Sequence, residues 1–350
     1  MIQTYSSTIR RKEMDAVLTC MVDEKIGPGE LNGRLIQQVK EFFRCDGAIA
    51  CRSPAVALGY ALRALGIGIG EKVMISALAP AWQYQFLQSE GFLPVVLDVE
   101  EETALVSAET VAGGVAGGGR ALVLHEAEGI LPDFAEILQC GIPVIEDISM
   151  SAGASLPELD EQGNETGRRK AGLFGAYSIL GLEERDVVTG GGGAVLMAPG
   201  RREWIVLKRL ADGAPVTDLL PDLNSALAWI QLKEFPRNEA ARKEIFSLYQ
   251  HSCMIGRHKM LVRGMDDAST ASCFPLVLSS PFRDVRQYAA RKDIEIAPAF
   301  AGSVIDFFEE PSASCIHAKS LHLRCAHFPL YPRLTHSECA RISKVLGSLP

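Results

Sequence analysis

The strongest chemical signal in the sequence is a pair of carboxylates at the end of an apolar segment. Residues 143–147 read PVIED, so Glu146 and Asp147 follow three apolar residues. Ligands of parallel α/β sheets bind outside the carboxyl ends of the strands. An acidic pair more often only solvates a loop, but its place at a strand end makes Asp147 a candidate for holding a positively charged ring nitrogen of a ligand.

Two other patterns suggest ligands but match no known site. The four glycines at 190–193 are not followed by the Lys-Ser/Thr pair of a phosphate-binding P-loop. Two cysteines and three histidines lie close together, in a C-x-H-x4-H-x2-C-x-H spacing that matches no common structural zinc pattern: Cys315, His317, His322, Cys325 and His327. Because a free cysteine is usually a small core residue, we expect no metal site.

Composition indicates a large folded protein whose partners are small molecules or other proteins. The chain has 350 residues, 47% of them hydrophobic, which suits about two domains. Its net charge of −8 argues against a nucleic-acid-binding surface. The nine cysteines form no CxxC pair, which favours a reduced compartment, and no segment offers the roughly 20 apolar residues of a membrane span. We therefore expect a cytoplasmic protein that binds neither nucleic acid nor membrane.

The hydrophobic pattern alternates helices with short strands. Apolar residues recur every three or four positions over 30–43, as on one face of a helix. Short apolar runs at 73–75, 94–97, 121–124 and 143–145 are separated by helical or turn-rich stretches. This alternation predicts an α/β fold with a mostly parallel sheet sandwiched by helices. The polar segment 159–170 predicts an exposed loop.

A change of pattern after about residue 240 indicates a second unit. We interpret residues 1–28 as an N-terminal arm, 29–240 as a large domain and 241–350 as a smaller C-terminal α+β domain. Strands are expected at 258–263, 272–278 and 294–297. Pro236 is expected to kink or break the long helix that begins near residue 223.

Several segments, taken in order, resemble the DegT/StrS-type sugar aminotransferases, which belong to fold type I of the pyridoxal-phosphate enzymes. The resemblance spans about residues 28–348 and is clearest at 51–76, 91–99, 143–155, 189–196, 226–235 and 328–335. It implies a fold type I architecture, a homodimer, a sugar-nucleotide ligand and a role in sugar or polysaccharide biosynthesis.

The resemblance also implies cofactor-binding roles for particular residues. Asp147 would lie under the pyridine nitrogen of pyridoxal phosphate. Ser53 and Ala55 would begin the helix whose N-terminus meets the phosphate, where backbone N–H groups suit an anion. Ser178 corresponds to a second phosphate-contacting serine, although counting back from the glycine run without gaps puts Leu180 there.

The Schiff-base lysine of the family is missing from its expected place. Family members carry it eight residues before the last glycine of the glycine turn, and that position here is Arg185. A guanidinium stays protonated up to a pKa of about 12 or more, so it cannot act as the neutral amine that a Schiff base needs. The nearest lysines along the chain are Lys170 and Lys208. We therefore expect a catalytically degenerate homologue that acts in binding or regulation and holds pyridoxal phosphate weakly, without a covalent bond.

Other family positions have changed together with the lysine. The family's Ser-Gly-Thr near the phosphate reads Ser-Pro-Ala at 53–55, the stacking aromatic falls near Pro80, and the Gln three residues after the Asp reads Met150. Retained packing with altered site positions is typical of lost or altered catalysis. The alternatives are an enzyme that uses the cleft without the cofactor, or an active pyridoxal- or pyridoxamine-phosphate enzyme with lysine-free chemistry. A sugar dehydratase in which His125, at the end of a predicted strand, moves protons is an example of the latter.

Overall fold

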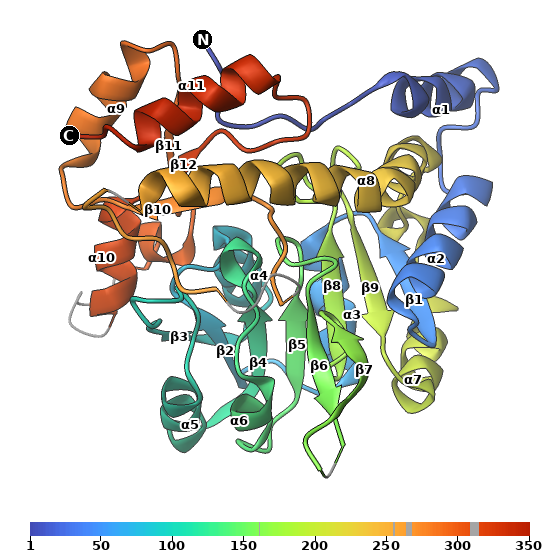
Figure 1. The fold of residues 1–350 in the computed structure, drawn as a ribbon. Coiled ribbons are helices and arrows are strands. Elements are labelled where there is room, and N and C mark those ends of the chain that lie inside the picture. The colour runs from blue at the N-terminus through green and yellow to red at the C-terminus, as the bar shows by residue number, and fades with distance from the viewer. Residues whose placement is uncertain (161, 255, 264–267, 309–314) are drawn as a thin grey trace.

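The computed structural model describes residues 1–350 except 161, 255, 264–267 and 309–314, and a seven-stranded sheet forms its centre (Figure 1). The strand order is β1–β9–β8–β5–β4–β2–β3, with β9 antiparallel to both of its neighbours and the other strands pointing one way. The strands are β1 (Gly47–Cys51), β2 (Lys72–Ser76), β3 (Leu93–Leu97), β4 (Gly119–His125), β5 (Val144–Asp147), β8 (Tyr177–Gly181) and β9 (Ala194–Ala198).

Helices cover both faces of this sheet, because its strands carry apolar side chains on both sides. Ile75 and Val123 face one layer, Met74 and Leu122 face the other, and all four are fully buried. Continuous apolar runs of this kind are typical of parallel sheets. One layer contains α3 (Pro54–Ala64), α4 (Ala81–Ser89) and α7 (Arg201–Ala211), and the other contains α2 (Glu30–Phe43), α5 (Ala108–Ala116), α6 (Phe134–Leu138) and the first half of α8 (Asp222–Cys253).

The C-terminal part forms a smaller sheet beside the main one (Figure 1). Its antiparallel order is β10–β12–β11, and its core joins Tyr249 of α8 to Phe274 and Phe328, all fully buried. The elements of this part are β10 (Phe274–Val277), α9 (Phe282–Ala290), β11 (Ala297–Pro298), α10 (Ile316–Arg324), β12 (Cys325–Phe328) and α11 (His336–Leu346). Three short 3-10 helices lie in connections along the whole chain: η1 (Ala127–Gly129), η2 (Val216–Asp218) and η3 (Val304–Asp306). No helix among the described residues has the length and hydrophobicity that crossing a bilayer requires.

The main elements follow the sequence pattern closely. The apolar runs at 73–75, 94–97, 121–124 and 143–145 lie in β2, β3, β4 and β5 of one sheet, as predicted. The helix predicted over 30–43 is α2. The strands appear as continuous apolar runs because they are buried on both faces, whereas α2 shows a period of about 3.6 because it buries one face.

Two expectations about the less regular segments are wrong, and the interpretation of residues 1–28 as an N-terminal arm stays a prediction. The segment 159–170 contains β7 (Glu165–Lys170), which pairs with β6 (Ser155–Leu159) in a hairpin that is too polar and solvent-exposed to show alternation. The N-terminal arm includes a helix, α1 (Arg11–Val22). Residues 258–263 form no strand, and only Lys259 makes an isolated bridge, to Val277.

The expected break at Pro236 is also wrong, because α8 continues through it. Proline removes one N–H group from the helix, yet Phe235 before it and Ile245 after it are buried in different apolar clusters. Burial on both sides therefore holds the helix together. Residue 240, the proposed domain boundary, lies inside this continuous helix.

The first residue of α8 holds the start of α2, which is distant in sequence. The buried carboxylate of Asp222 accepts hydrogen bonds from the backbone N–H groups of Gly29 (2.9 Å), Leu31 (3.1 Å) and Asn32 (2.8 Å). The N-cap residue Gly29 has no side chain that could accept them. Because these N–H groups have no partner within the helix, Asp222 both caps α2 and fastens it to α8.

We predict that Asp222→Ala lowers the free energy of unfolding by about 2–3 kcal/mol, because buried donors lose a charged acceptor. Urea unfolding followed by circular dichroism measures the change. The matched control is Asp212→Ala, which removes an exposed carboxylate paired with Lys208 at the end of α7 and should cost less than about 1 kcal/mol. Equal losses in the two variants would contradict the capping role.

Candidate functional site

A cavity of about 270 Å³ lies at the carboxyl ends of β4 and β5. Its wall combines parts of the chain that are far apart in sequence: His125 at the end of β4, Arg185 after β8, Tyr5 of the N-terminal arm and His327 of β12. This edge of an open α/β sheet is where ligands bind. The cavity is therefore the candidate functional site.

Asp147 lies directly behind the cavity wall with both carboxylate oxygens engaged. Oδ2 accepts a hydrogen bond from Gln83 Nε2 at 2.8 Å and lies 3.0 Å from His125 Nδ1. Oδ1 accepts hydrogen bonds from the Ser149 hydroxyl and from the Ser149 backbone N–H, the latter at 3.2 Å. An ionised carboxylate has about four lone-pair positions, so these protein groups fill its hydrogen-bonding capacity.

The same contacts keep Asp147 ionised although it is fully buried. Burial alone would raise the pKa of Asp147, but the hydrogen bond and charge of His125 and the hydrogen bonds from Ser149 outweigh it, and the pKa lies below its ordinary value. Because an ionised carboxylate only accepts hydrogen bonds, the proton between the two side chains belongs on His125 Nδ1.

Arg185 lies at the cavity wall. Its guanidinium stands over the ring of Tyr5, with Cζ 4.5 Å from the ring centroid, in a cation–π contact. The Tyr5 hydroxyl in turn lies 2.7 Å from His327 Nδ1. Tyr5 of the N-terminal arm thus contacts both Arg185 and His327 at the cavity wall.

The nearest lysines of the chain lie elsewhere. Lys170 donates from Nζ to the backbone carbonyl of Phe42 and lies 3.9 Å from that residue's ring centroid. Lys208 pairs with Asp212 at 2.7 Å on exposed α7. No lysine is found among the described residues that line the cavity.

The start of α3 offers few donors to an anion. Ser53 is its N-cap, as predicted, but its Oγ accepts the Val56 N–H at 3.2 Å. Pro54, at the first helical position, has no N–H. Ala55 follows in the first turn, and of residues 53–55 only Pro54 belongs to the cavity wall. This leaves the Ala55 N–H as the main donor of the first turn.

Ser178, the second predicted phosphate contact, is not among the described residues that line the cavity. It is fully buried in β8, and its hydroxyl donates to the backbone carbonyl of Gly172 at 2.8 Å. The structure thus gathers His125, Asp147 and Arg185 around the cavity and places Ser178 elsewhere.

Acidic groups dominate the charges of the cavity wall. Glu128, Glu183 and Asp186 line it, whereas Arg185 is the only arginine among its described lining residues. Desolvation raises the pKa of Asp186 to about 8, outweighing the hydrogen bond that it accepts from the Glu183 backbone N–H at 2.7 Å. Asp186 is therefore mostly protonated at neutral pH.

Sequence reasoning missed four residues that define this cavity or support it: Tyr5, Gln83, Glu128 and Asp186. Glu128 lies only three residues after His125, and this spacing beyond a strand end is a usable signal. Tyr5 comes from the opposite end of the chain, so no local pattern connects it to the site. Gln83 lies on a weakly amphipathic helix and looks like a surface residue in sequence.

Several solved structures share this fold. The aminotransferase from Psychrobacter cryohalolentis matches with a TM-score of 0.85 and 18% sequence identity over 97% of each chain. The aminotransferase TlmJ from Streptoalloteichus hindustanus matches with a TM-score of 0.85 and 16% identity, over 99% of this chain and 98% of that one. GDP-4-keto-6-deoxy-D-mannose-3-dehydratase from E. coli, with bound hydrated pyridoxal phosphate, matches with a TM-score of 0.83 and 15% identity over 99% of each chain.

These similarities confirm the predicted fold type I architecture, with its mostly parallel sheet between two helix layers. The model of the DegT/DnrJ/EryC1/StrS aminotransferase family matches residues 7–347, a range that contains His125, Asp147 and Arg185. It also contains all the sequence segments that carry the family resemblance. This chain therefore belongs to the DegT/DnrJ/EryC1/StrS aminotransferase family.

Proposed function

We propose that this protein is a catalytically degenerate member of its family that acts as a binding or regulatory homologue in sugar or polysaccharide biosynthesis. The observation that supports this proposal is the cavity wall, which contains Arg185 but, among its described lining residues, no lysine. The family resemblance puts the Schiff-base lysine at position 185. Transamination with pyridoxal phosphate needs the amine of such a lysine. We infer that ordinary transamination is lost.

The ring-binding and phosphate-binding residues do not fit pyridoxal phosphate well either. The Asp147 oxygens are taken by Gln83, His125 and Ser149, so a ring nitrogen would have to displace one of these donors. The start of α3 offers few free N–H groups, because Pro54 has none and the Val56 N–H is bound to Ser53. We infer that pyridoxal phosphate binds weakly and without a covalent bond.

A sugar nucleotide is the ligand class that we propose for the cavity. The related E. coli enzyme acts on GDP-4-keto-6-deoxy-D-mannose, as its name states, and its fold covers 99% of this chain. The carboxyl groups of Glu183 and Asp186 at the cavity wall are suited to form hydrogen bonds with sugar hydroxyls, and the protonated Asp186 can also donate one. Regulation by ligand binding then needs no chemical step.

A lysine-free dehydratase is the second candidate, and the His125–Asp147 pair favours it. His125 lines the cavity while its Nδ1 is held 3.0 Å from the buried Asp147 carboxylate. A histidine oriented by a carboxylate is a common general acid or base. This function requires a bound pyridoxal or pyridoxamine phosphate, so a measurement of cofactor binding separates it from the first candidate.

We also propose a homodimer in which α1 contributes to the contact. Met14, Leu18, Met21 and Val22 form one face of α1 and are 55–73% exposed. The opposite face, with buried Cys20 and Glu13, packs toward α8. An exposed apolar stripe on an otherwise packed helix marks an interaction surface, and the family resemblance identifies a second copy of the chain as its partner.

The first prediction concerns cofactor binding by the unmodified protein. Because the cavity offers no amine, pyridoxal phosphate added to the protein should keep the absorbance spectrum of the free aldehyde and be removed by dialysis. Borohydride treatment followed by peptide mapping should find no stoichiometric adduct at one lysine. A stoichiometric adduct at Lys170 or Lys208 would contradict the proposal and indicate a rerouted transaminase.

The second prediction tests whether the lysine alone is missing. Arg185→Lys should gain no stoichiometric borohydride-trapped adduct, because Asp147 and the start of α3 still lack free partners for the cofactor. Glu184→Lys, in the same exposed connection, is the matched control for nonspecific labelling. Specific labelling at position 185, above the level at position 184, would show that the rest of the site is intact.

The third prediction concerns assembly. Light scattering at micromolar concentration should give the mass of a dimer, and Leu18→Glu should shift it to that of a monomer, because it places a charge in an apolar contact. Leu323→Glu, at a position on α10 that is 64% exposed, is the control and should leave the dimer intact. A monomeric unmodified protein, or an unaffected Leu18→Glu dimer, would exclude the proposed interface.

A further inference from the structure

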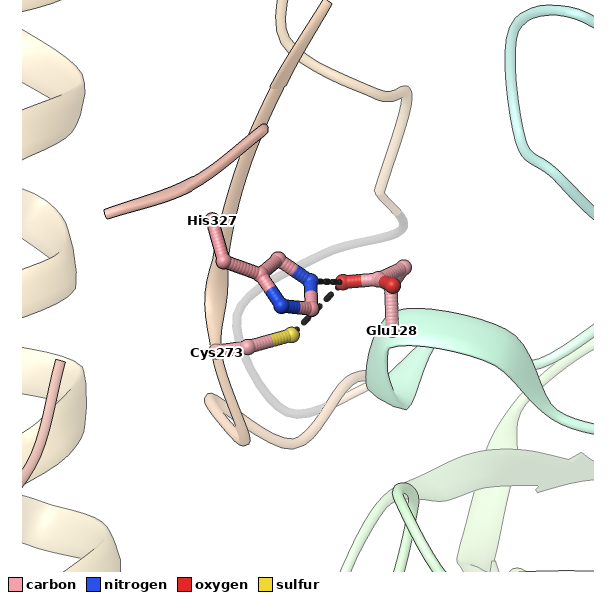
Figure 2. A group of neighbouring side chains, drawn as sticks. All are labelled: Glu128, Cys273 and His327. Carbon is pink, nitrogen blue, oxygen red and sulfur yellow. Dashed lines mark hydrogen bonds and ion pairs between the residues drawn. The ribbon is translucent and has the colours of Figure 1, made fainter. Parts of the chain in front are cut away.

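Three potential metal ligands from separate segments meet at the cavity wall. Glu128 lies in η1, directly after β4, whereas Cys273 precedes β10 and His327 lies in β12 (Figure 2). All three side chains are at least nine-tenths buried. Among the described residues, this is the one group of three His, Cys, Asp or Glu side chains whose ligand atoms lie within 4.8 Å of one another.

The three ligand atoms lie slightly closer together than they would around a small cation, so the side chains must separate a little to admit one. Glu128 Oε2 lies 2.7 Å from His327 Nε2 and 2.7 Å from Cys273 Sγ. Zinc binds nitrogen and oxygen at about 2.0 Å and sulfur at about 2.3 Å, so ligand atoms in its tetrahedron are about 3.3–3.8 Å apart. Small side-chain rotations therefore open the hydrogen-bonded cluster to the size of a zinc site.

The surroundings orient the ligands as they would around a metal. His327 Nδ1 lies 2.7 Å from the Tyr5 hydroxyl, which fixes the ring and directs Nε2 toward Glu128. Metal-binding histidines typically have such an outer partner on the second ring nitrogen. Arg263 is a nearby cation, but it donates its hydrogen bonds to the backbone carbonyls of Glu128 and Thr270. The Glu128 carboxylate therefore keeps its hydrogen bonds with Cys273 and His327.

The ligand types select the ion, and the cavity completes the coordination. One carboxylate, one thiolate and one neutral imidazole carry two negative charges, which balance a dication of the borderline-soft class. Glu128 and His327 both line the cavity, whereas Cys273 lies behind it. Three protein ligands with a fourth position open to a cavity form the arrangement of zinc sites that bind water or substrate.

We propose that Glu128, Cys273 and His327 bind a zinc-class divalent cation whose fourth ligand is an oxygen from the cavity. On binding, the Cys273 thiol releases its proton to solvent and its sulfur forms the metal bond. The proton of neutral His327 moves from Nε2 to Nδ1, where it is donated to the Tyr5 hydroxyl oxygen, and Nε2 becomes free to bind the metal. The ion joins η1 of the main sheet layer to β10 and β12 of the C-terminal part. Only the folded chain brings these ligands together, so binding stabilises the fold.

Cobalt(II) is the probe for this site, because thiolate bound to cobalt gives an intense charge-transfer band. The metal-stripped full-length protein should take up one equivalent of cobalt with this band, lose the band to one equivalent of zinc, and unfold at a higher temperature with either metal. Cys273→Ser should abolish the band. Glu128→Gln and His327→Gln each remove a direct metal ligand and should lower the affinity for cobalt. The loss should exceed the roughly 10- to 100-fold that follows when only a hydrogen-bond partner of a ligand is removed.

Matched variants separate this site from the other thiols and imidazoles. Cys45→Ser removes another buried free thiol, which donates to the Gly47 carbonyl, and should leave the band unchanged. His322→Gln removes a histidine that pairs with Asp306 at 3.0 Å and should also leave it unchanged. Absence of the band in the unmodified protein, its persistence in Cys273→Ser, or equal loss in Cys45→Ser would overturn the proposal.

A second measurement needs no variant, in case Cys273→Ser fails to fold. X-ray absorption of the zinc-loaded unmodified protein should show one sulfur at about 2.3 Å and the remaining ligands as nitrogen or oxygen at about 2.0 Å. A shell without sulfur, or with two or more sulfurs, would overturn the proposed ligand set. Neither result depends on the missing lysine, so the metal site and the proposed degenerate function are tested separately.

Discussion

The carboxylate of Asp147 is the group on which the site depends, because a buried charge must be satisfied by hydrogen bonds wherever the fold places it. Its place at the end of β5 is fixed by the apolar residues before it, which are buried on both faces of the sheet. Gln83 of α4, His125 of β4 and Ser149 supply the donors. The donors that stabilise this charge also occupy the oxygens that the family resemblance assigns to a ring nitrogen.

The neighbouring carboxylate has a structural role on the other side of the same strand. Glu146 accepts hydrogen bonds from the backbone N–H groups of Gly172 (2.7 Å), Phe174 (2.7 Å) and Gly175, and thereby holds the connection into β8. Burial and the charge of Glu146 raise the pKa of Glu126 well above its ordinary value, which favours its neutral form. The acidic pair at the end of β5 is thus divided between a site residue and a fold residue.

Sequence reasoning succeeded where a single element sets the pattern and failed where distant segments meet. The parallel strands were predictable because they are buried on both faces and appear as continuous apolar runs, and α2 because it buries one apolar face. The roles assigned to Asp147 and Arg185 stay predictions. The β6–β7 hairpin is polar on both faces and gives no alternation. Continuity of α8 through Pro236 depends on tertiary burial. No local pattern reveals contacts between residues that are more than a hundred positions apart in sequence. Tyr5 makes such contacts with Arg185 and His327, and Glu128 makes one with Cys273.

The central claim is that the candidate site of this family fold has no lysine among its described lining residues and an aspartate, Asp147, whose oxygens already have hydrogen-bond partners. A crystal structure of the protein soaked with pyridoxal phosphate tests this most directly. The account predicts that the ligand, where it binds at all, has no covalent bond to the chain, and that Asp147 keeps its contacts with Gln83, His125 and Ser149. Continuous density between the cofactor and a lysine, with Asp147 released from these donors and turned to the ring nitrogen, would contradict it.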